Sequence, residues 1–274
     1  MLKRSFLFVP GDRPERFDKA TRSGAHGVII DLDDAVAPDS KAAARSNVAQ
    51  WLDPEHPVYV RINRTHTDSC NADLAAIADR PGLIGVVVPD AETPEQLLTV
   101  ANRLAQTAQI IALTETALGI WNAYALASMP QTTRLAFGSL DLMKDTGIED
   151  DDKGLLFARS RIVIASRAAN IEPPVDGVTT TIDDLDAVSR DATRSRYLGF
   201  GGKLCIHPSH VDPINRAFDP SASDIAWAKD ILEAVGDSEH GAIRYAGEMV
   251  DRPVIERAKN ILGLTGRAQR KTDN

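Results

Sequence analysis

The sequence predicts an α/β protein: a (β/α)8 TIM barrel followed by a C-terminal helical lid extension. Eight short apolar runs alternate with longer segments whose apolar residues recur at helical spacing. The short runs are almost continuously apolar, as expected for parallel strands buried on both faces. A length of 274 residues suits one α/β barrel with an addition.

The expected strands are short, and the seventh, near Val175, is the weakest. In chain order they are Ser5–Val9, Gly27–Asp31, Val58–Ile62, Ile84–Val88, Ile110–Thr114, Leu135–Gly138, the run near Val175, and Lys203–Ile206. The expected barrel helices are Pro14–Ser23, Ser40–Leu52, Ala72–Ala78, Pro94–Ala105, Ala117–Ala127, Leu155–Asn170, Asp183–Leu198 and Val211–Ala217. This alternation favours a closed barrel over an open sheet.

Two more helices, Ala222–Val235 and Pro253–Leu262, follow the eighth unit, and the Gly-rich segment Gly236–Gly247 joins them. A complete barrel does not need them. The sequence therefore predicts a barrel catalytic domain at residues 1–220 and a C-terminal helical extension or lid at residues 221–274. The apolar faces of the extension must be buried, either as a cap on the barrel or against a neighbouring subunit.

Composition narrows the class of protein. A net charge of -8 and a pI near 5.3 argue against a nucleic-acid partner. No apolar run approaches the roughly 20 residues that a membrane span needs. The apolar run Phe6–Val9 is too short for a signal-peptide core. The two cysteines, Cys70 and Cys205, form no metal or redox motif. These features predict a cytoplasmic protein with no membrane partner.

Polar side chains follow the expected strands, where a barrel enzyme carries its active site. They comprise the run Asp31–Asp34 after the second strand, Arg61 at the end of the third, Asp90 after the fourth, Glu115 after the fifth, Asp141 after the sixth and His207 after the eighth. Several strand ends thus deliver carboxylates to one face of the barrel. Each residue also has a structural interpretation: a helix cap for each acid, a salt bridge for Arg61 and an ordinary loop position for His207.

Carboxylates gathered at one face repel one another, and a bound divalent cation relieves that repulsion. Ligands that are all oxygen favour Mg²⁺ or a similar hard ion, with water and substrate completing the octahedron. His and Cys are scarce, which argues against zinc. The strand ends alone therefore predict a barrel with an acidic mouth that suits Mg²⁺.

Seven blocks of sequence carry a recognisable pattern: Ser5–Gly11 with Arg13–Phe17 and Lys19–Ala20; Val28–Val36 with Lys41 and Ala44–Arg45; Val60–Asn63; Thr114–Ile120; Phe137–Leu142; Gly199–Lys203 with Ile206–Ser209; and Gly247–Pro253. In order from about Ser5 to Leu262, they resemble the citrate lyase β-subunit and malyl-CoA/citramalyl-CoA lyase family of the HpcH/HpaI aldolase/citrate lyase superfamily. Any one block is a weak signal, but all seven in order form a strong one.

The resemblance implies a role for each matching residue at the barrel mouth. Glu115 and Asp141 would bind Mg²⁺, the implied cofactor. Arg61 would hold the oxygen atoms of the substrate beside the metal. Asp33 and Asp34 would contact water molecules on the metal.

The resemblance also implies a CoA entry and an oligomer. Phe8, Arg16 and Lys19 would lie near the bound CoA. Asp251 would enter the site of an adjacent subunit as acid or base, within a homotrimer or hexamer. On sequence alone, Asp251 also reads as a residue that caps the helix beginning near Pro253.

Two positions depart from the family pattern. The family usually has glutamate where this chain has Asp33, so one methylene is lost. It commonly has Pro-Lys after the fourth strand, whereas this chain has Pro89-Asp90. Asp90 should repel any extra carboxylate that the family lysine would meet, which disfavours a citryl substrate.

The implied function is a Mg²⁺-dependent carbon–carbon lyase, an oxo-acid lyase that cleaves a malyl-, citramalyl- or citryl-like acyl-CoA into acetyl-CoA and a keto or aldehyde acid by retro-Claisen cleavage. One alternative is an acyl-CoA thioester hydrolase of the same family. Another is a non-catalytic or complex-dependent citrate lyase β-like subunit, which the departure at Asp90 favours. The acyl group, and whether a carrier protein replaces CoA, stay open at this point.

Overall fold

The computed structural model describes residues 2–236 and 243–269, which fall into two compact units. The barrel unit contains Leu2–Asn215, and the C-terminal unit begins at Arg216. Each unit has its own hydrophobic core. They are described separately below, and the expected domain division at residue 220 stays a prediction.

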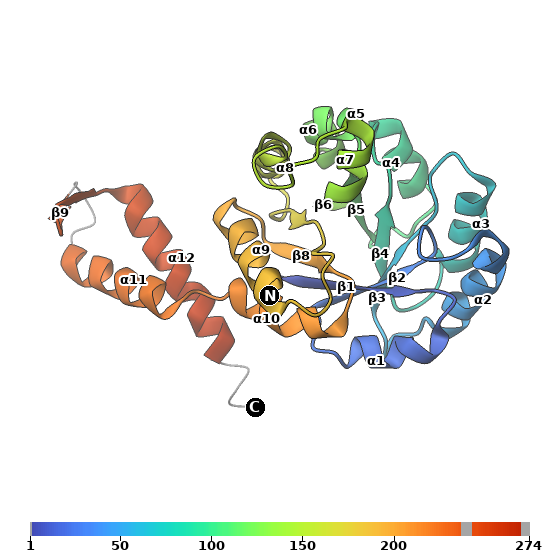
Figure 1. The fold of residues 1–274 in the computed structure, drawn as a ribbon, viewed down its shortest axis with the longest axis horizontal. Helices are drawn as coiled ribbons and strands as arrows, with labels where there is room; N and C mark the ends of the chain where they lie inside the picture. Colours follow the sequence, from blue (N-terminus) through green and yellow to red (C-terminus); the bar gives the residue numbers. More distant parts are fainter. Residues whose placement is uncertain (1, 237–242, 270–274) are drawn as a thin grey trace. The chain divides into compact units, whose positions relative to one another are not determined.

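The barrel unit is a closed ring of eight parallel strands in chain order, with β1 paired to both β2 and β8 (Figure 1). The predicted (β/α)8 barrel is therefore confirmed. The strands are β1 (Ser5–Pro10), β2 (Gly27–Asp31), β3 (Val58–Arg61), β4 (Leu83–Val88), β5 (Gln109–Thr114), β6 (Thr132–Phe137), β7 (Val175–Asp176) and β8 (Gly202–Cys205).

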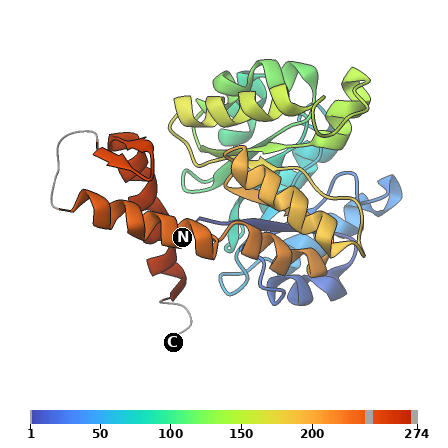
Figure 2. The same cartoon turned by 60° about the vertical axis from the view of Figure 1, so that its left-hand side comes forward.

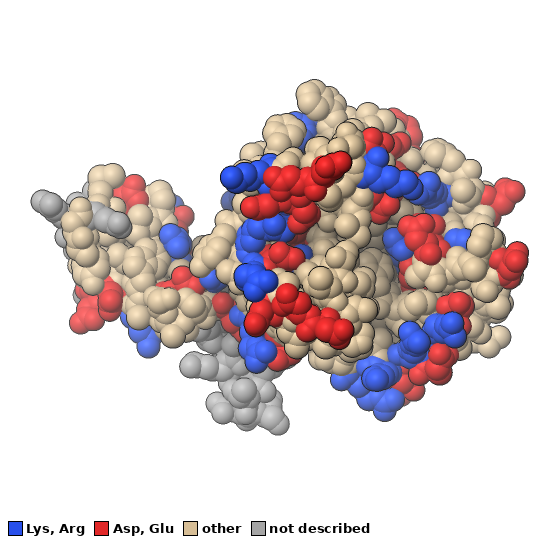
Figure 3. Space-filling model, viewed as in Figure 1, with Lys and Arg blue, Asp and Glu red and all other residues tan. Residues whose placement is uncertain are grey.

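Helices surround this ring on its outside (Figure 1). They are η1 (Pro14–Arg16), α1 (Phe17–Thr21), η2 (Pro38–Ser40), α2 (Lys41–Trp51), α3 (Asp68–Ile77), α4 (Pro94–Ala101), α5 (Ala117–Trp121), α6 (Ala123–Ala127), α7 (Ser139–Thr146), α8 (Leu156–Ala168), α9 (Leu185–Tyr197), η3 (Pro208–His210) and α10 (Val211–Ala217). One predicted helix is divided into α5 and α6 at Asn122, and α7 was not predicted. Figure 3 shows acidic and basic side chains next to each other over the face of the barrel in view.

The barrel interior is filled by apolar side chains from alternate positions of the strands. Phe6, Ile29, Tyr59, Ile111 and Leu113 belong to this buried cluster. Burying a large apolar side chain stabilises the fold by about 1.5–3 kcal/mol. Side chains two residues apart share a face of a strand, so the inward face continues from the core to the carboxyl end of each strand.

The strand β7 is the shortest of the ring and pairs with β6 through one residue, Val175. Its second residue, Asp176, is fully buried and accepts hydrogen bonds from Arg159 Nε at 3.1 Å and Ser195 Oγ at 2.5 Å. Burial raises the pKa of Asp176, but the positive charges of Lys203 and Arg159 outweigh it, so the pKa lies below the ordinary value. Buried ion pairs thus support the wall of the barrel where the ladder is short.

The C-terminal unit contains α11 (Ala222–Val235), a hairpin of β9 (Ile243–Tyr245) and β10 (Glu248–Val250), and α12 (Arg252–Gln269). Figure 2 shows α11 and α12 packed side by side, in orange and red. Ala228, Ile231, Val250 and Ala258 form the buried contact between these elements. In the part of the chain that the structure describes, no helix has the length and apolar character needed to cross a membrane.

The hairpin was not predicted from the Gly-rich segment that contains most of it. Ala246 and Gly247 occupy the two turn positions, and both have positive φ, at 48° and 91°. A two-residue turn with both φ values positive has the backbone twist that joins antiparallel strands. The remainder of the expected linker, residues 237–242, lies outside the described residues.

Candidate active site

A cavity of about 370 Å³ opens at the carboxyl ends of the strands. It is lined by Phe8, Asp31, Asp34, Ala35, Arg61, Leu113, Glu115, Phe137, Gly138, Ser139, Leu140, Asp141, Val178, Leu204 and Ile206. The structure therefore brings together five residues that the sequence singled out. They are Phe8, Asp34, Arg61, Glu115 and Asp141.

Glu115 directly follows β5 and is only 5% exposed. Its Oε1 accepts a hydrogen bond from the main-chain nitrogen of Asp90 at 2.9 Å. Burial raises the pKa of Glu115 to about 8, and the nearby carboxylate of Asp141 adds to the effect. The positive charge of Arg61 lowers the pKa of Glu115 but is outweighed by burial and the neighbouring carboxylates, and a divalent cation would supply the further compensation.

Gly138 provides the room for the Glu115 side chain. A Cβ built on Gly138 would lie less than 3.0 Å from both Cβ and Oε2 of Glu115. The φ of Gly138 is -94°, which any residue adopts, so the glycine is needed for space and not for its backbone freedom. The next residues begin α7, whose first turn carries Asp141 to the same cavity.

The two acids fit a magnesium ion better than a transition metal. Among the described residues, no group of three or more His, Cys, Asp or Glu side chains forms a complete metal cage. Mg²⁺ is commonly held by one or two carboxylates, with water and substrate oxygens in its other positions. The crowded pair of Glu115 and Asp141, open to the cavity, matches that requirement.

Arg61 is the last residue of β3, and its side chain is 12% exposed. Its Nε and Nη2 donate to Oδ1 and Oδ2 of Asp31 at 2.7 and 2.5 Å. Burial would lower the pKa of Arg61, but the Asp31 carboxylate raises it above the ordinary value. Arg61 therefore lines the cavity and remains charged, and its role toward the substrate stays a prediction.

Asp31 was not selected from the sequence, although it begins the Asp31–Asp34 run. The signal that could have found it is the alternation along β2. Ile29 belongs to the interior cluster, so Asp31, two residues later, has to point to the same side. Tyr59 and Arg61 on β3 have the same relation, and Asp31 is paired with Arg61 in the ladder.

Asp33 and Asp34 point to different surroundings. Asp34 lines the cavity, with its Oδ2 3.7 Å from Arg61 Nη1. Asp33 is 6% exposed, and its Oδ2 has no hydrogen-bond partner in the structure. Burial raises the pKa of Asp33 to about 6, with Asp34 adding repulsion. Such an unpartnered buried oxygen suits a water molecule or a cation.

A buried polar network holds the loop of Asp33 in place. Lys41 Nζ donates to the carbonyl oxygens of Leu32 and Asp33, each at 3.0 Å, and to the side chain of Asn63. Asn63 in turn donates to Asp73 Oδ2 at 2.7 Å. The loop that carries Asp33 and Asp34 is therefore fixed by α2 and by the segment after β3.

The other residues expected near CoA lie at different positions. Phe8 lines the cavity, and its ring centroid is 5.1 Å from Arg61 Cζ. Arg16 and Lys19, on η1 and α1, are exposed and do not line the cavity. Asp251 belongs to the C-terminal unit, where its Oδ1 accepts from the Val254 nitrogen at 3.4 Å at the start of α12. Its proposed entry into a neighbouring site stays a prediction.

Asp90, the departure from the family pattern, forms an ion pair. Its Oδ2 lies 2.7 Å from Arg64 Nε, so the segments after β3 and β4 are joined. Its φ is 43°, in the left-handed region that aspartate tolerates better than most residues. A positive charge therefore lies beside position 90, but it is the guanidinium of Arg64, from the segment after β3.

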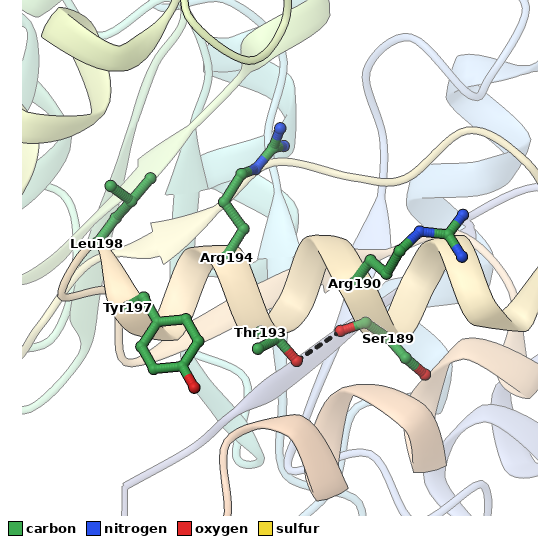
Figure 4. A pocket seen from close by; sticks show the side chains of 6 residues that line it. All are labelled: Ser189, Arg190, Thr193, Arg194, Tyr197 and Leu198. Atoms are coloured by element: carbon green, nitrogen blue, oxygen red, sulfur yellow. Dashed lines mark hydrogen bonds between the residues drawn. The ribbon is translucent and has the colours of Figure 1, made fainter.

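A larger hollow of about 520 Å³ lies along the outer face of α9, and Figure 4 shows the six residues that line it. Several of its polar groups already have partners. Ser189 and Thr193 donate to main-chain oxygens of their own helix at 2.9 and 2.8 Å. Arg194 pairs with Asp151 at 2.9 Å, and Arg190 lies 3.8 Å from Asp184. The barrel mouth, with its converging charges, is the candidate site despite its smaller volume.

Comparison with known proteins places this geometry in context. A family model described as HpcH/HpaI aldolase/citrate lyase matches residues 4–208. A citrate lyase subunit beta-like protein of Deinococcus radiodurans is 36% identical over 277 residues, covering 95% of this chain and 96% of that protein. A (3S)-malyl-CoA thioesterase of Cereibacter sphaeroides is 30% identical, covering 92% of this chain and 89% of that protein.

A solved structure of similar fold carries ligands. The protein CitE from Mycobacterium tuberculosis, in complex with magnesium, acetoacetate and coenzyme A, is 34% identical to this chain. The TM-score is 0.87, with 97% of this chain and 98% of that chain covered.

Proposed function

Because this chain belongs to the HpcH/HpaI aldolase/citrate lyase family, we propose that it is a Mg²⁺-dependent carbon–carbon lyase acting on a 3-hydroxyacyl-CoA thioester. The observation that carries the proposal is the meeting of Glu115, Asp141 and Arg61 in one cavity at the carboxyl end of the barrel. The binding of magnesium, acetoacetate and coenzyme A by the similar CitE protein supports both the cofactor and the substrate class.

Glu115 and Asp141 would hold the Mg²⁺ ion, and Asp33 and Asp34 would accept hydrogen bonds from its water ligands. When bound, the metal supplies a Lewis acid and a template for the hydroxyl and carboxylate oxygens of the substrate. Phe8, Arg16 and Lys19 would contact the CoA portion. The exposed charges of Arg16 and Lys19 suit its phosphate groups.

In the reaction, the substrate loses its hydroxyl proton and the bond between C2 and C3 breaks. The electron pair left on the oxygen forms a double bond to C3, which leaves as the carbonyl carbon of a keto or aldehyde acid. The bonding electrons move to C2 as the enolate of acetyl-CoA, and C2 then takes up a proton. Arg61 would donate hydrogen bonds to the developing negative charge, a form of stabilisation that is often the largest contribution to catalysis. Asp251 would move the proton, a step typically worth about 10²–10⁴-fold.

A thioester hydrolase is the second candidate, and the 30% identity to a (3S)-malyl-CoA thioesterase is the observation that favours it. A non-catalytic or complex-dependent citrate lyase β-like subunit is a third. The buried acids and the paired Arg61 favour a catalytic protein, because a non-catalytic subunit has no need to keep carboxylates without a fully compensating charge in a cavity.

The proposed assembly is a cytoplasmic homotrimer or hexamer without nucleic-acid or membrane partners. The apolar residues of α11 and α12 are buried against each other, not left open as the sequence suggested, so the proposed role as a lid depends on the resemblance to the family, and Asp251 would then reach the site of an adjacent subunit. Lids of this kind exclude water from reactive enolates.

The test is a screen of the purified protein with Mg²⁺ against malyl-, citramalyl- and citryl-CoA, with product analysis. A lyase releases acetyl-CoA, a hydrolase releases free CoA, and a non-catalytic subunit releases neither. Glu115→Gln and Asp141→Asn should each abolish Mg²⁺ binding in calorimetry while the protein stays folded. Unchanged Mg²⁺ affinity in both variants would refute the assignment of the metal ligands.

A further inference from the structure

We propose that Asp31 is the positioning residue of the site, which fixes the guanidinium of Arg61 in one orientation toward the substrate. The inference deepens the proposed function, because it concerns the same cavity. It rests on the hydrogen bonds of a residue that the assigned metal and substrate contacts do not include.

Both partners occupy adjacent strands at the same height of the barrel. Asp31 ends β2 and Arg61 ends β3, and the two are partners in the ladder. Their side chains are 2% and 12% exposed. Because both backbones are held by the sheet, the two parallel N–H···O bonds between them have a fixed geometry that arginine suits and lysine does not.

The carboxylate of Asp31 has no acceptor site left for a metal or a substrate. Its Oδ1 accepts from Arg61 Nε and from the Asp33 nitrogen at 2.8 Å. Its Oδ2 accepts from Arg61 Nη2 and from the Ala35 nitrogen at 3.2 Å. A carboxylate offers about four lone-pair sites, and these four donors fill them. Asp31 therefore acts through Arg61 and through the loop of Asp33, and not on the reacting atoms.

The pairing decides which edge of Arg61 is free. Nε and Nη2 of Arg61 are turned to Asp31. Nη1 lies 3.7 Å from Oδ2 of Asp34, a residue that lines the cavity. The ring of Phe8 packs on the guanidinium, with 5.1 Å between its centroid and Arg61 Cζ. Asp31 holds the edge of the guanidinium and Phe8 limits its face, so the Nη1 end is the part presented to substrate oxygens.

The first test is a double-mutant cycle on kcat between Asp31→Asn and Arg61→Lys. In the wild-type background, Asp31→Asn should lower kcat about 100-fold with little change in KM, as expected for a misplaced catalytic group. In the Arg61→Lys background it should change kcat by less than about threefold, since the group it positions is already gone. Equal factors in the two backgrounds would overturn the proposal.

A matched control is Asp176→Asn, which removes the negative charge of another buried carboxylate paired with an arginine, one that does not line the cavity. Any effect of this variant on kcat should be the same factor with and without Arg61→Lys. A general loss of stability would behave like this control, whereas a positioning residue would not.

A second readout needs no activity and so separates this proposal from the proposed function. In spectra of the protein with ¹⁵N-labelled arginine, the Nε–H of Arg61 should exchange slowly with solvent, and its signal is assigned by its loss in Arg61→Lys. The signal should move or broaden in Asp31→Asn and persist in Asp176→Asn. Fast exchange in the wild type would overturn the proposal even if Asp31→Asn does not fold. If no thioester is turned over but the signal behaves as expected, the proposed function fails and the pairing stands.

Discussion

Adding a single methyl group at Gly138 should weaken magnesium binding without touching any charged residue. The Cβ of Gly138→Ala would lie within 3.0 Å of both Cβ and Oε2 of Glu115. Rotating the carboxylate relieves only part of this overlap, because the Cβ of Glu115 is fixed by the backbone directly after β5. Either Glu115 or the start of α7 must therefore move. Glu115 is itself a proposed metal ligand, and the first turn of α7 contains the other, Asp141.

The size of the effect follows from the overlap. Inserting a methyl group into a packed region costs about 1–3 kcal/mol. If the free energy of unfolding falls by about 2 kcal/mol, the melting temperature should fall by about 4–8 °C, from the usual scaling for domains of about 200 residues. Displacing a ligand carboxylate should weaken Mg²⁺ binding by about 10–100-fold, the range seen when groups that orient metal ligands are changed.

The assay is calorimetric titration with Mg²⁺, together with thermal melts with and without the ion. A matched control is Gly263→Ala on α12, where an added Cβ would have nothing within 4 Å. That variant should keep the wild-type Mg²⁺ affinity and gain about 0.5–1 kcal/mol of helix stability. If Gly138→Ala binds Mg²⁺ as tightly as the wild type, then Glu115 is not a metal ligand or Gly138 does not set its position.

Three further predictions address specificity, assembly and acid stability. Turnover of citryl-CoA should be slower than that of malyl- or citramalyl-CoA, because the family lysine is replaced by Asp90 and the nearby Arg64 is already paired with Asp90 at 2.7 Å, so it is not available to an additional carboxylate; faster citryl turnover would contradict this. Mixing the Asp251→Asn and Glu115→Gln variants under subunit exchange should restore part of the activity, whereas a fully active monomer would exclude a role across subunits. At pH 7, Asp176→Asn should cost about 3–5 kcal/mol, as for a broken buried pair. The folded-state pKa of Asp176 is below the ordinary value, so the ionised Asp176 stabilises the fold above about pH 3.9 and this stabilisation is lost as the pH falls further. The melting temperatures of the wild type and Asp176→Asn should therefore converge in acid. A constant difference between them down to about pH 3 would refute the pairing.

The sequence predicted the barrel well because strands buried on both faces are continuous apolar runs. It was least precise where the local pattern is weak. The strand β7 was expected near Val175, but its two residues form no apolar run from which its bounds could be predicted. The helix α7 is short and directly follows a strand, so no helix was predicted over Ser139–Thr146. Helix boundaries such as the break at Asn122 depend on packing that single residues do not reveal.

The candidate site was predictable to the extent that it depends on strand ends. Arg61, Glu115 and Asp141 were placed at the mouth because carboxyl ends of parallel strands meet at one face of a barrel. Which residue of the Asp31–Asp34 run faces inward was missed, because that depends on the register of β2. The ion pair between Arg64 and Asp90 was also missed, since it joins two loops whose conformations the sequence does not give.

The short strand β7 makes the ring unequal around its circumference. Its neighbours are joined to it through one register pair on one side and two on the other, Val175 to Gly202 and Asp176 to Lys203. The buried charges of Asp176, Arg159 and Lys203 contribute to the cohesion at this seam, so we expect its stability to depend on acid more than that of the apolar seams. When the barrel unfolds, we expect the pairings of β7 with β6 and with β8 to separate first, and the amide hydrogens of these pairings to exchange fastest. If the ring separates only at β7, the other strand pairs remain joined as a curved sheet. Closing the barrel again then requires only the pairings of β7 to re-form.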